Sequence, residues 1–178
     1  MSNGSNPYAT LLALAERSRS VAIDLPAKEN ARTHWNGLGF SLLGHRFVVP
    51  MSEIAELMLV PQATRLPGVK HFVLGIANVR GKLMAVLDLP AFFGSTKTVA
   101  MERRRVFAIE NDEMYFGFIV DESMGMQHFP QDAFEEMIAV DEMFRPFVKG
   151  GYNVAGTSWP VLSLVALAAD KHFEKLAY

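Results

Sequence analysis

Short apolar segments separated by turn-forming residues dominate the chain from Gly37 onward. Phe40–Leu43 and Arg46–Val49 are predicted to be strands, and the Gly44-His45 pair predicts a tight glycine turn between them. Further hairpins are predicted around Arg80-Gly81, Asn111-Asp112 and Gly156-Thr157. Many short strands at near-regular spacing are typical of β-barrels and β-sandwiches, so the pattern predicts a mainly β protein.

Helical patterns are expected mainly at the two ends of the chain. Residues 8–18 predict a short helix, and residues 164–176 predict a closing helix. The segment 53–60 suits a helix or a strand, but its short length and its flanking prolines favour a strand entered through a turn. We expect residues 1–35 to be a partly flexible extension that either solubilises the protein or docks on a surface, and residues 36–178 to be the folded domain.

An internal repeat is the most informative feature of the sequence. Residues 72–81 match residues 147–156 without a gap, at a constant offset of 75 positions from Phe72 to Phe147. Both copies continue to an apolar Val-Leu pair, at 86–87 and at 161–162. The chain therefore contains two copies of one unit, made of a loop, a strand, a glycine turn, a strand and a short helix. Two small barrels packed against each other are the simplest architecture that uses this unit twice.

Differences between the two copies separate the needs of the hairpin from other roles. Three polar residues of the first copy change in the second: Arg80 to Ala155, Lys82 to Thr157 and Asp88 to Ser163. We interpret these side chains as dispensable for the hairpin, whereas the shared glycines and valines serve the backbone and the core. Arg80 lies at the tip of a turn, where it either contacts a partner or is an ordinary solvated arginine.

Composition and charge exclude several classes of protein. The net charge is −2, with 50% hydrophobic and 20% charged residues, so neither nucleic acid nor an anionic membrane surface is an expected partner. The chain has no cysteine, which excludes disulfides and thiolate chemistry and suits a reducing cytoplasm. No segment approaches the roughly 20 consecutive apolar residues of a membrane span. We expect a soluble, cytoplasmic protein that does not insert into the membrane.

No pattern in the sequence predicts a catalytic or metal centre. The five histidines lie far apart, and the adjacent acidic pairs at 121–122 and 141–142 suit acid–base catalysis poorly. Nucleophile-elbow, phosphate-loop and dinucleotide motifs are absent. The basic run Arg103–Arg105 precedes a predicted strand, where it is expected to be a solvated edge. We expect no enzyme activity, metal or cofactor, and the ten methionines favour adaptable contacts with other proteins.

The segment Gly75–Leu89 resembles the signature of the CheW family of chemotaxis adaptors. It reads Gly-Ile-Ala-Asn-Val-Arg-Gly-Lys-Leu-Met-Ala-Val-Leu-Asp-Leu. The family pattern is Gly-Val-x-Asn-Leu-Arg-Gly, two or three apolar residues, then Pro-Val-x-Asp-Leu. Residues 47–57 and 116–121 resemble further family elements, so the similarity covers about residues 37–175. The N-terminal extension is similar to that of the PilI group, the CheW-like proteins of type IV pilus (twitching motility) chemosensory systems. Ala85 and Leu57 depart from the pattern without touching its charged positions.

The resemblance implies a CheW-like fold of two five-stranded β-barrel subdomains around a shared hydrophobic core, with a short C-terminal helix and no active site. Family members bridge the cytoplasmic tip of a methyl-accepting chemoreceptor to the regulatory domain of a CheA-type histidine kinase. Four residues match family positions tied to receptor binding: Ile54, Glu56, Gly75 and Arg80. Two alternatives stay open. One is a CheW-like adaptor of a flagellar or cyclic-dinucleotide pathway. The other is a small β-barrel enzyme, although the absence of catalytic motifs argues against it.

Overall fold

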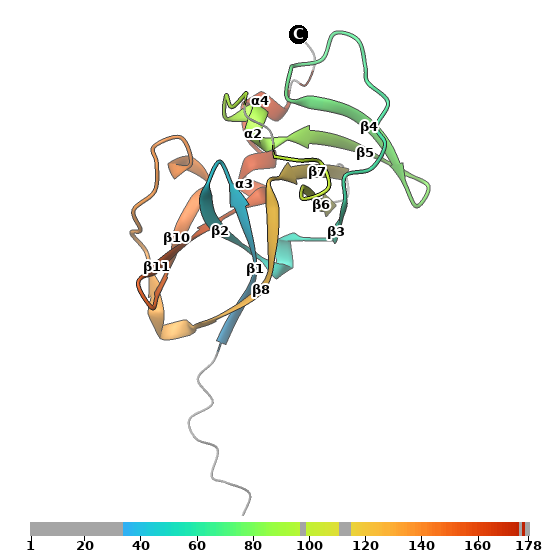
Figure 1. Ribbon diagram of the computed structural model, residues 1–178. Coiled ribbons are helices and arrows are strands. Elements are labelled where there is room, and N and C mark those ends of the chain that lie inside the picture. Colours follow the sequence, from blue (N-terminus) through green and yellow to red (C-terminus); the bar gives the residue numbers. More distant parts are fainter. Residues whose placement is uncertain (1–33, 97–98, 111–114, 175, 177–178) are drawn as a thin grey trace, which may run out of the picture. The chain divides into compact units, whose positions relative to one another are not determined.

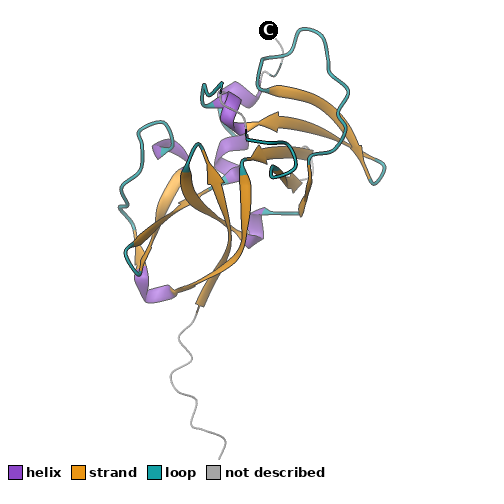
Figure 2. Ribbon diagram, in the orientation of Figure 1, coloured by secondary structure: helices purple, strands orange, loops and turns teal. Residues whose placement is uncertain are grey.

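The computed structural model describes residues 34–96, 99–110, 115–174 and 176, which fall within one compact unit of the chain. The described part is mainly β, as predicted, with short helices between the strands (Figure 2). The helix predicted at 8–18 lies outside the described residues. The predicted boundary near residue 36 stays a prediction.

The strands form two sheets (Figure 1). The first sheet has the order β8-β1-β2-β11-β10-β9, with β1 (His34–Leu42), β2 (His45–Pro50), β8 (Glu122–Pro130), β9 (Phe134–Glu135), β10 (Val148–Val154) and β11 (Thr157–Leu162). The second has the order β3-β6-β7-β5-β4, with β3 (Glu56–Leu59), β4 (Val73–Val79), β5 (Lys82–Asp88), β6 (Arg105–Glu110) and β7 (Tyr115–Val120). The helices are η1 (Met51–Glu53), α2 (Leu89–Phe92), η2 (Gln131–Ala133), η3 (Arg145–Phe147), α3 (Leu164–Ala168) and α4 (Lys171–Glu174).

The two sheets repeat one pattern of strand pairing. In the first, the antiparallel hairpin β1–β2 pairs in parallel with β11 of the hairpin β10–β11. In the second, the hairpin β6–β7 pairs in parallel with β5 of the hairpin β4–β5. The hairpins β4–β5 and β10–β11 are the two copies found in the sequence, so the predicted duplication is confirmed.

Each sheet closes into a barrel through a bent strand. In the first barrel β9 follows β8 after the single turn η2 and pairs with β10 at Gly151↔Glu135. In the second, the chain beyond β3 pairs with β4 at Thr64↔Ile76. Ile76 and Gly151 are equivalent positions of the repeat, so both barrels close at the same place. The first sheet has six strands rather than the predicted five because η2 divides its closing strand into β8 and β9.

The main hydrophobic core contains side chains from both sheets. Phe40 of β1 packs edge-on against Phe107 of β6, with ring centroids 5.3 Å apart, and Phe47 and Phe118 belong to the same buried cluster. Each barrel also has a smaller interior cluster, built around Ile119 and its neighbours in the second and around aromatic side chains in the first. The shared core that the family resemblance implied is therefore present.

One turn, the closing helix and the segment 53–60 differ in detail from the sequence-based expectations. The β1–β2 turn is Leu43-Gly44 rather than Gly44-His45, with φ of 54° and 82°, the geometry of a tight hairpin turn. The predicted closing helix is interrupted after Ala168, because the Asp170 carboxylate accepts the His172 backbone N–H at 2.8 Å and so begins α4. The segment 53–60 is a strand only over β3, after η1.

Candidate functional site

Glu56 and Arg80, two of the four predicted contact residues, meet beside the β4–β5 turn. The Arg80 Nη2 lies 2.7 Å from Glu56 Oε1 on β3. Arg80 has φ of 52°, and its counterpart Ala155 has φ of 50°, so the turn itself makes no demand on this side chain. The Arg80 side chain is 78% exposed and that of Glu56 25% exposed. The pair therefore holds a guanidinium at the surface rather than locking the fold, since exposed ion pairs contribute at most about 1 kcal/mol.

A second ion pair lies beside the first. Lys82 pairs with Glu110, and the hydrogen bond to this carboxylate, together with its charge, raises the pKa of Lys82. Burial raises the pKa of the Tyr115 hydroxyl, and the carboxylates of Glu56 and Glu110 raise it further. Arg80 and Lys82 act on Tyr115 in the opposite direction. We call Glu56, Arg80, Lys82, Glu110 and Tyr115 the charged cluster. It contains two cations, two carboxylates and a tyrosine, so the cluster as a whole has no net charge.

Ile54 and Gly75 are placed differently from this pair. Ile54 is half-buried and packs against the main core between η1 and β3. Gly75 has φ of +146°, and a Cβ atom there would lie 2.2 Å from the carbonyl oxygen of Thr64. The equivalent Gly150 has φ of +114° and the carbonyl oxygen of Glu135 at 2.6 Å from the same position. Both glycines are thus required where the barrels close, and a direct partner contact by Gly75 stays a prediction.

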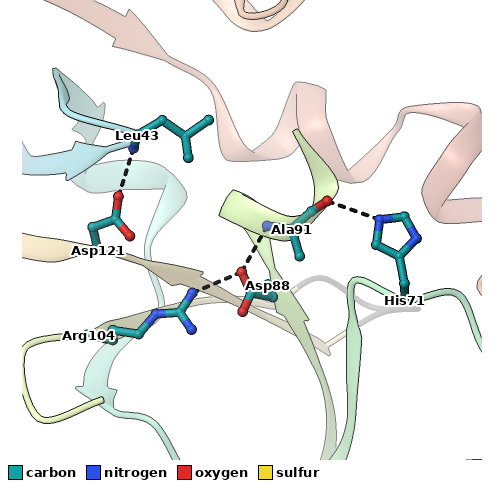
Figure 3. Close-up of polar contacts among 6 residues, drawn as sticks. All are labelled: Leu43, His71, Asp88, Ala91, Arg104 and Asp121. Carbon is teal, nitrogen blue, oxygen red and sulfur yellow. Dashed lines mark hydrogen bonds and ion pairs between the residues drawn. The ribbon is translucent and has the colours of Figure 1, made fainter. Parts of the chain in front are cut away.

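Arg104 is the residue that the sequence interpretation misplaced most. It was expected in a solvated edge, yet only 3% of its side chain is exposed and its Nη2 lies 2.9 Å from Asp88 Oδ1 (Figure 3). Its neighbour Arg103 does lie at the surface, where it pairs with Glu122. A run of three arginines carries no signal that would distinguish the buried one, because burial depends on how β5 and β6 assemble.

Asp88, which we interpreted as dispensable for the hairpin, has a structural role in the helix that follows it. Its carboxylate accepts the Ala91 backbone N–H at 3.0 Å and so caps the N-terminus of α2 (Figure 3). The equivalent Ser163 accepts the Ala166 N–H at 3.2 Å and caps α3. Aspartate and serine are both favoured N-caps, so the two copies differ in residue type but not in role. An N-cap residue before each short helix was the signal available in the sequence.

Asp121 also has a structural role. Only 6% of the residue is exposed, and its carboxylate accepts the Leu43 backbone N–H at 2.7 Å (Figure 3). This bond ties the β1–β2 turn of the first barrel to the end of β7 in the second. Among the described residues, no three or more histidine or acidic side chains gather in a way that could hold a metal ion. No helix in the same part of the chain is long and apolar enough to cross a membrane.

Comparisons with known proteins agree with the fold. Residues 36–172 match the family model described as a CheW-like domain. Protein PilI of Pseudomonas aeruginosa is 39% identical over 178 residues, covering 99% of each chain. Chemotaxis protein CheW of Helicobacter pylori is 25% identical over 108 residues, covering 61% of this chain and 65% of that protein. The crystal structure of the scaffolding protein TtCheW from Thermoanaerobacter tengcongensis has the same fold, with a TM-score of 0.70 at 23% identity, covering 82% of this chain and 100% of the other.

Proposed function

The chain belongs to the CheW-like family, and on this premise we propose that it is a non-enzymatic adaptor coupling a methyl-accepting chemoreceptor to a CheA-type histidine kinase. The pathway is the chemosensory control of type IV pilus twitching motility, because the similarity to PilI extends over 99% of both chains and so includes the N-terminal region. The protein acts in the cytoplasm beside membrane-bound receptor arrays, and it needs neither a cofactor nor nucleic acid.

The exposed guanidinium of Arg80 carries this proposal. A guanidinium has five N–H donors, and the Nη2 contact to Glu56 leaves others free for a carboxylate of a partner. The cytoplasmic tips of the chemoreceptors that CheW-like proteins bind are coiled coils that present carboxylates and apolar side chains. Leu83, 69% exposed, adds an apolar side chain to the surface of the same hairpin. The exposed guanidinium of Arg80 and the exposed apolar side chain of Leu83 are therefore complementary in chemistry to such a tip.

Arg80→Ala tests the receptor contact. The substitution copies Ala155, which has the same backbone conformation, so the melting temperature should not change. The affinity for a receptor-tip fragment should fall about tenfold in titration calorimetry, as expected for an interfacial arginine. Arg103→Ala is the matched control, because Arg103 is also an exposed arginine paired with a carboxylate. A melting temperature lowered by several degrees, or an equal loss of affinity in the control, would contradict the proposed role.

Titration against the isolated regulatory domain of the pilus-system kinase tests the other partner. Saturable binding in the micromolar range is expected, because a single adaptor contact is weak and strong association arises from the many contacts of an array. The regulatory domains of a flagellar kinase and of a cyclic-dinucleotide pathway kinase serve as comparisons. Tighter binding to either of them would move the protein to that pathway.

A further inference from the structure

A large open groove lies between α2, α4 and η3, away from the charged cluster. Its volume is about 700 Å³, and it is lined mainly by apolar side chains: Phe72, Phe92, Phe93, Met143, Pro146 and Phe147. In Figure 1, α2 and α4 lie together beside the five-stranded sheet. Phe72 and Phe147 are equivalent residues of the repeat, so the groove draws on both copies.

Ring contacts and hydrogen bonds hold the walls of the groove in place. Phe92 packs edge-on against Phe72, with ring centroids 5.2 Å apart. At the start of α2 the Asp88 carboxylate caps the helix and is itself held by Arg104 (Figure 3). At its end the His71 Nε2 donates to the carbonyl oxygen of Ala91 at 3.1 Å (Figure 3). The groove is therefore formed before any partner arrives.

The rim of the groove carries one lysine, Lys70, whose charge is not paired with a carboxylate among the described residues. Lys70 Nζ donates to the carbonyl oxygen of His172 at 3.0 Å and makes no ion pair with the residues that the structure describes. His71 lies on the same rim. Among the described residues lining the groove, Asp170 has the only carboxylate, and it already pairs with His172 Nδ1 at 2.6 Å. Burial acts to raise the pKa of Asp170, but the hydrogen bonds and charge of His172 outweigh it and lower that pKa.

We propose that this groove docks an acidic segment of a partner protein, with a bulky apolar side chain in the aromatic hollow and a carboxylate at Lys70. The groove is open, and Met143 at its edge is 49% exposed, so a small ligand would leave much of its own surface in water. A side chain presented by a protein segment needs no such enclosure. Methionine and aromatic side chains also suit adaptable contacts with proteins. The site uses none of the residues of the charged cluster and goes beyond the proposed function.

NMR titration of the ¹⁵N-labelled full chain with two blocked tetrapeptides tests the proposal. The acidic peptide Glu-Leu-Phe-Glu should shift the amides of Phe72, Phe92, Phe147 and His172 in a saturable manner. The basic peptide Lys-Leu-Phe-Lys, with the same apolar pair, should bind at least threefold more weakly, because it meets the like charge of Lys70. Equal affinities for the two peptides, or shifts scattered over the surface, would overturn the proposal.

Two surface variants and a control locate the contact. Lys70→Gln keeps a donor for the His172 carbonyl oxygen but removes the charge, and Met143→Glu makes the edge of the groove acidic. Each should weaken binding of the acidic peptide about threefold or more. Met101→Glu is the control. Met101 lies outside the groove, and its exposed fraction of 52% is similar to the 49% of Met143. Unchanged affinity in both groove variants would overturn the proposal. Binding of 4-phenylbutyrate as tight as that of the peptide would also overturn it, in favour of a site for small carboxylates.

Discussion

Gly75 and Arg80 belong to the same hairpin, and the internal repeat assigns them different physical roles. Gly75 recurs as Gly150, and in both copies a backbone carbonyl oxygen occupies the space where a side chain would begin. Arg80 recurs as Ala155 in an unchanged turn. A loss of partner binding after substitution of Gly75 therefore reports on barrel closure, whereas the same loss after substitution of Arg80 reports on a surface contact.

Gly75→Ala should lower the free energy of unfolding by about 2 to 4 kcal/mol, because the new Cβ forces the Thr64 carbonyl away and strains a backbone conformation that favours glycine. Gly81→Ala is the control. Gly81 also has a positive φ, of 84°, but open space surrounds its missing side chain, so only the conformational cost of about 1 kcal/mol applies. Urea denaturation measures both. Equal losses in the two variants would show that the Thr64 contact is unimportant.

At the scale of elements, the short helix α2 depends on a buried ion pair. A helix of four residues has little stability of its own, so its position rests on the Asp88 cap and on Arg104 behind it. The Arg104 Nε has no hydrogen-bond partner among the described residues, so the guanidinium is not fully satisfied by the fold. Removing the arginine leaves the Asp88 carboxylate without its countercharge.

Arg104→Ala should therefore cost about 3 kcal/mol of stability and increase hydrogen exchange at the amides of α2. Arg103→Ala changes an exposed pair in the same loop and should cost less than about 1 kcal/mol. Thermal unfolding and amide exchange of the two variants check this difference. If the two variants lost the same stability, the contact of Arg104 with Asp88 would not be important for the fold.

At the scale of the whole molecule, we expect the two barrels to unfold as one cooperative unit. The second barrel, β3 to β7, is inserted in the chain between β2 and β8 of the first. The main core joins them, since Phe40 and Phe47 of the first barrel belong to the same buried cluster as Phe107 and Phe118 of the second. Loss of packing in one barrel should therefore reach the other.

Phe118→Leu tests this coupling, because Phe118 is fully buried and lies in the second barrel. The smaller side chain should lower stability by about 1 kcal/mol. Hydrogen exchange should then accelerate by a similar factor at slowly exchanging amides of β1–β2 and β6–β7. Acceleration confined to β6–β7 would show instead that the barrels unfold independently.

The sequence by itself determined the features that depend on local periodicity and on comparison of the chain with itself. Short apolar segments predicted the strands, glycines marked the hairpins, and the repeat predicted two small barrels packed against each other. The repeat also drew attention to Arg80, because the equivalent residue of the second copy is Ala155. These signals are local, so no knowledge of long-range contacts was needed to use them.

Only the tertiary structure decided which polar residues meet and which are buried. Glu56 reaches Arg80, and Asp121 holds Leu43, because β-barrel assembly brings together segments that are far apart in the chain. Arg104 is buried beside Asp88 while Arg103 stays in solvent, although neighbouring positions in one basic run look alike in the sequence. The apolar groove with Lys70 at its rim likewise exists only once α2, α4 and η3 pack around it, since its lining comes from four separate stretches of the chain.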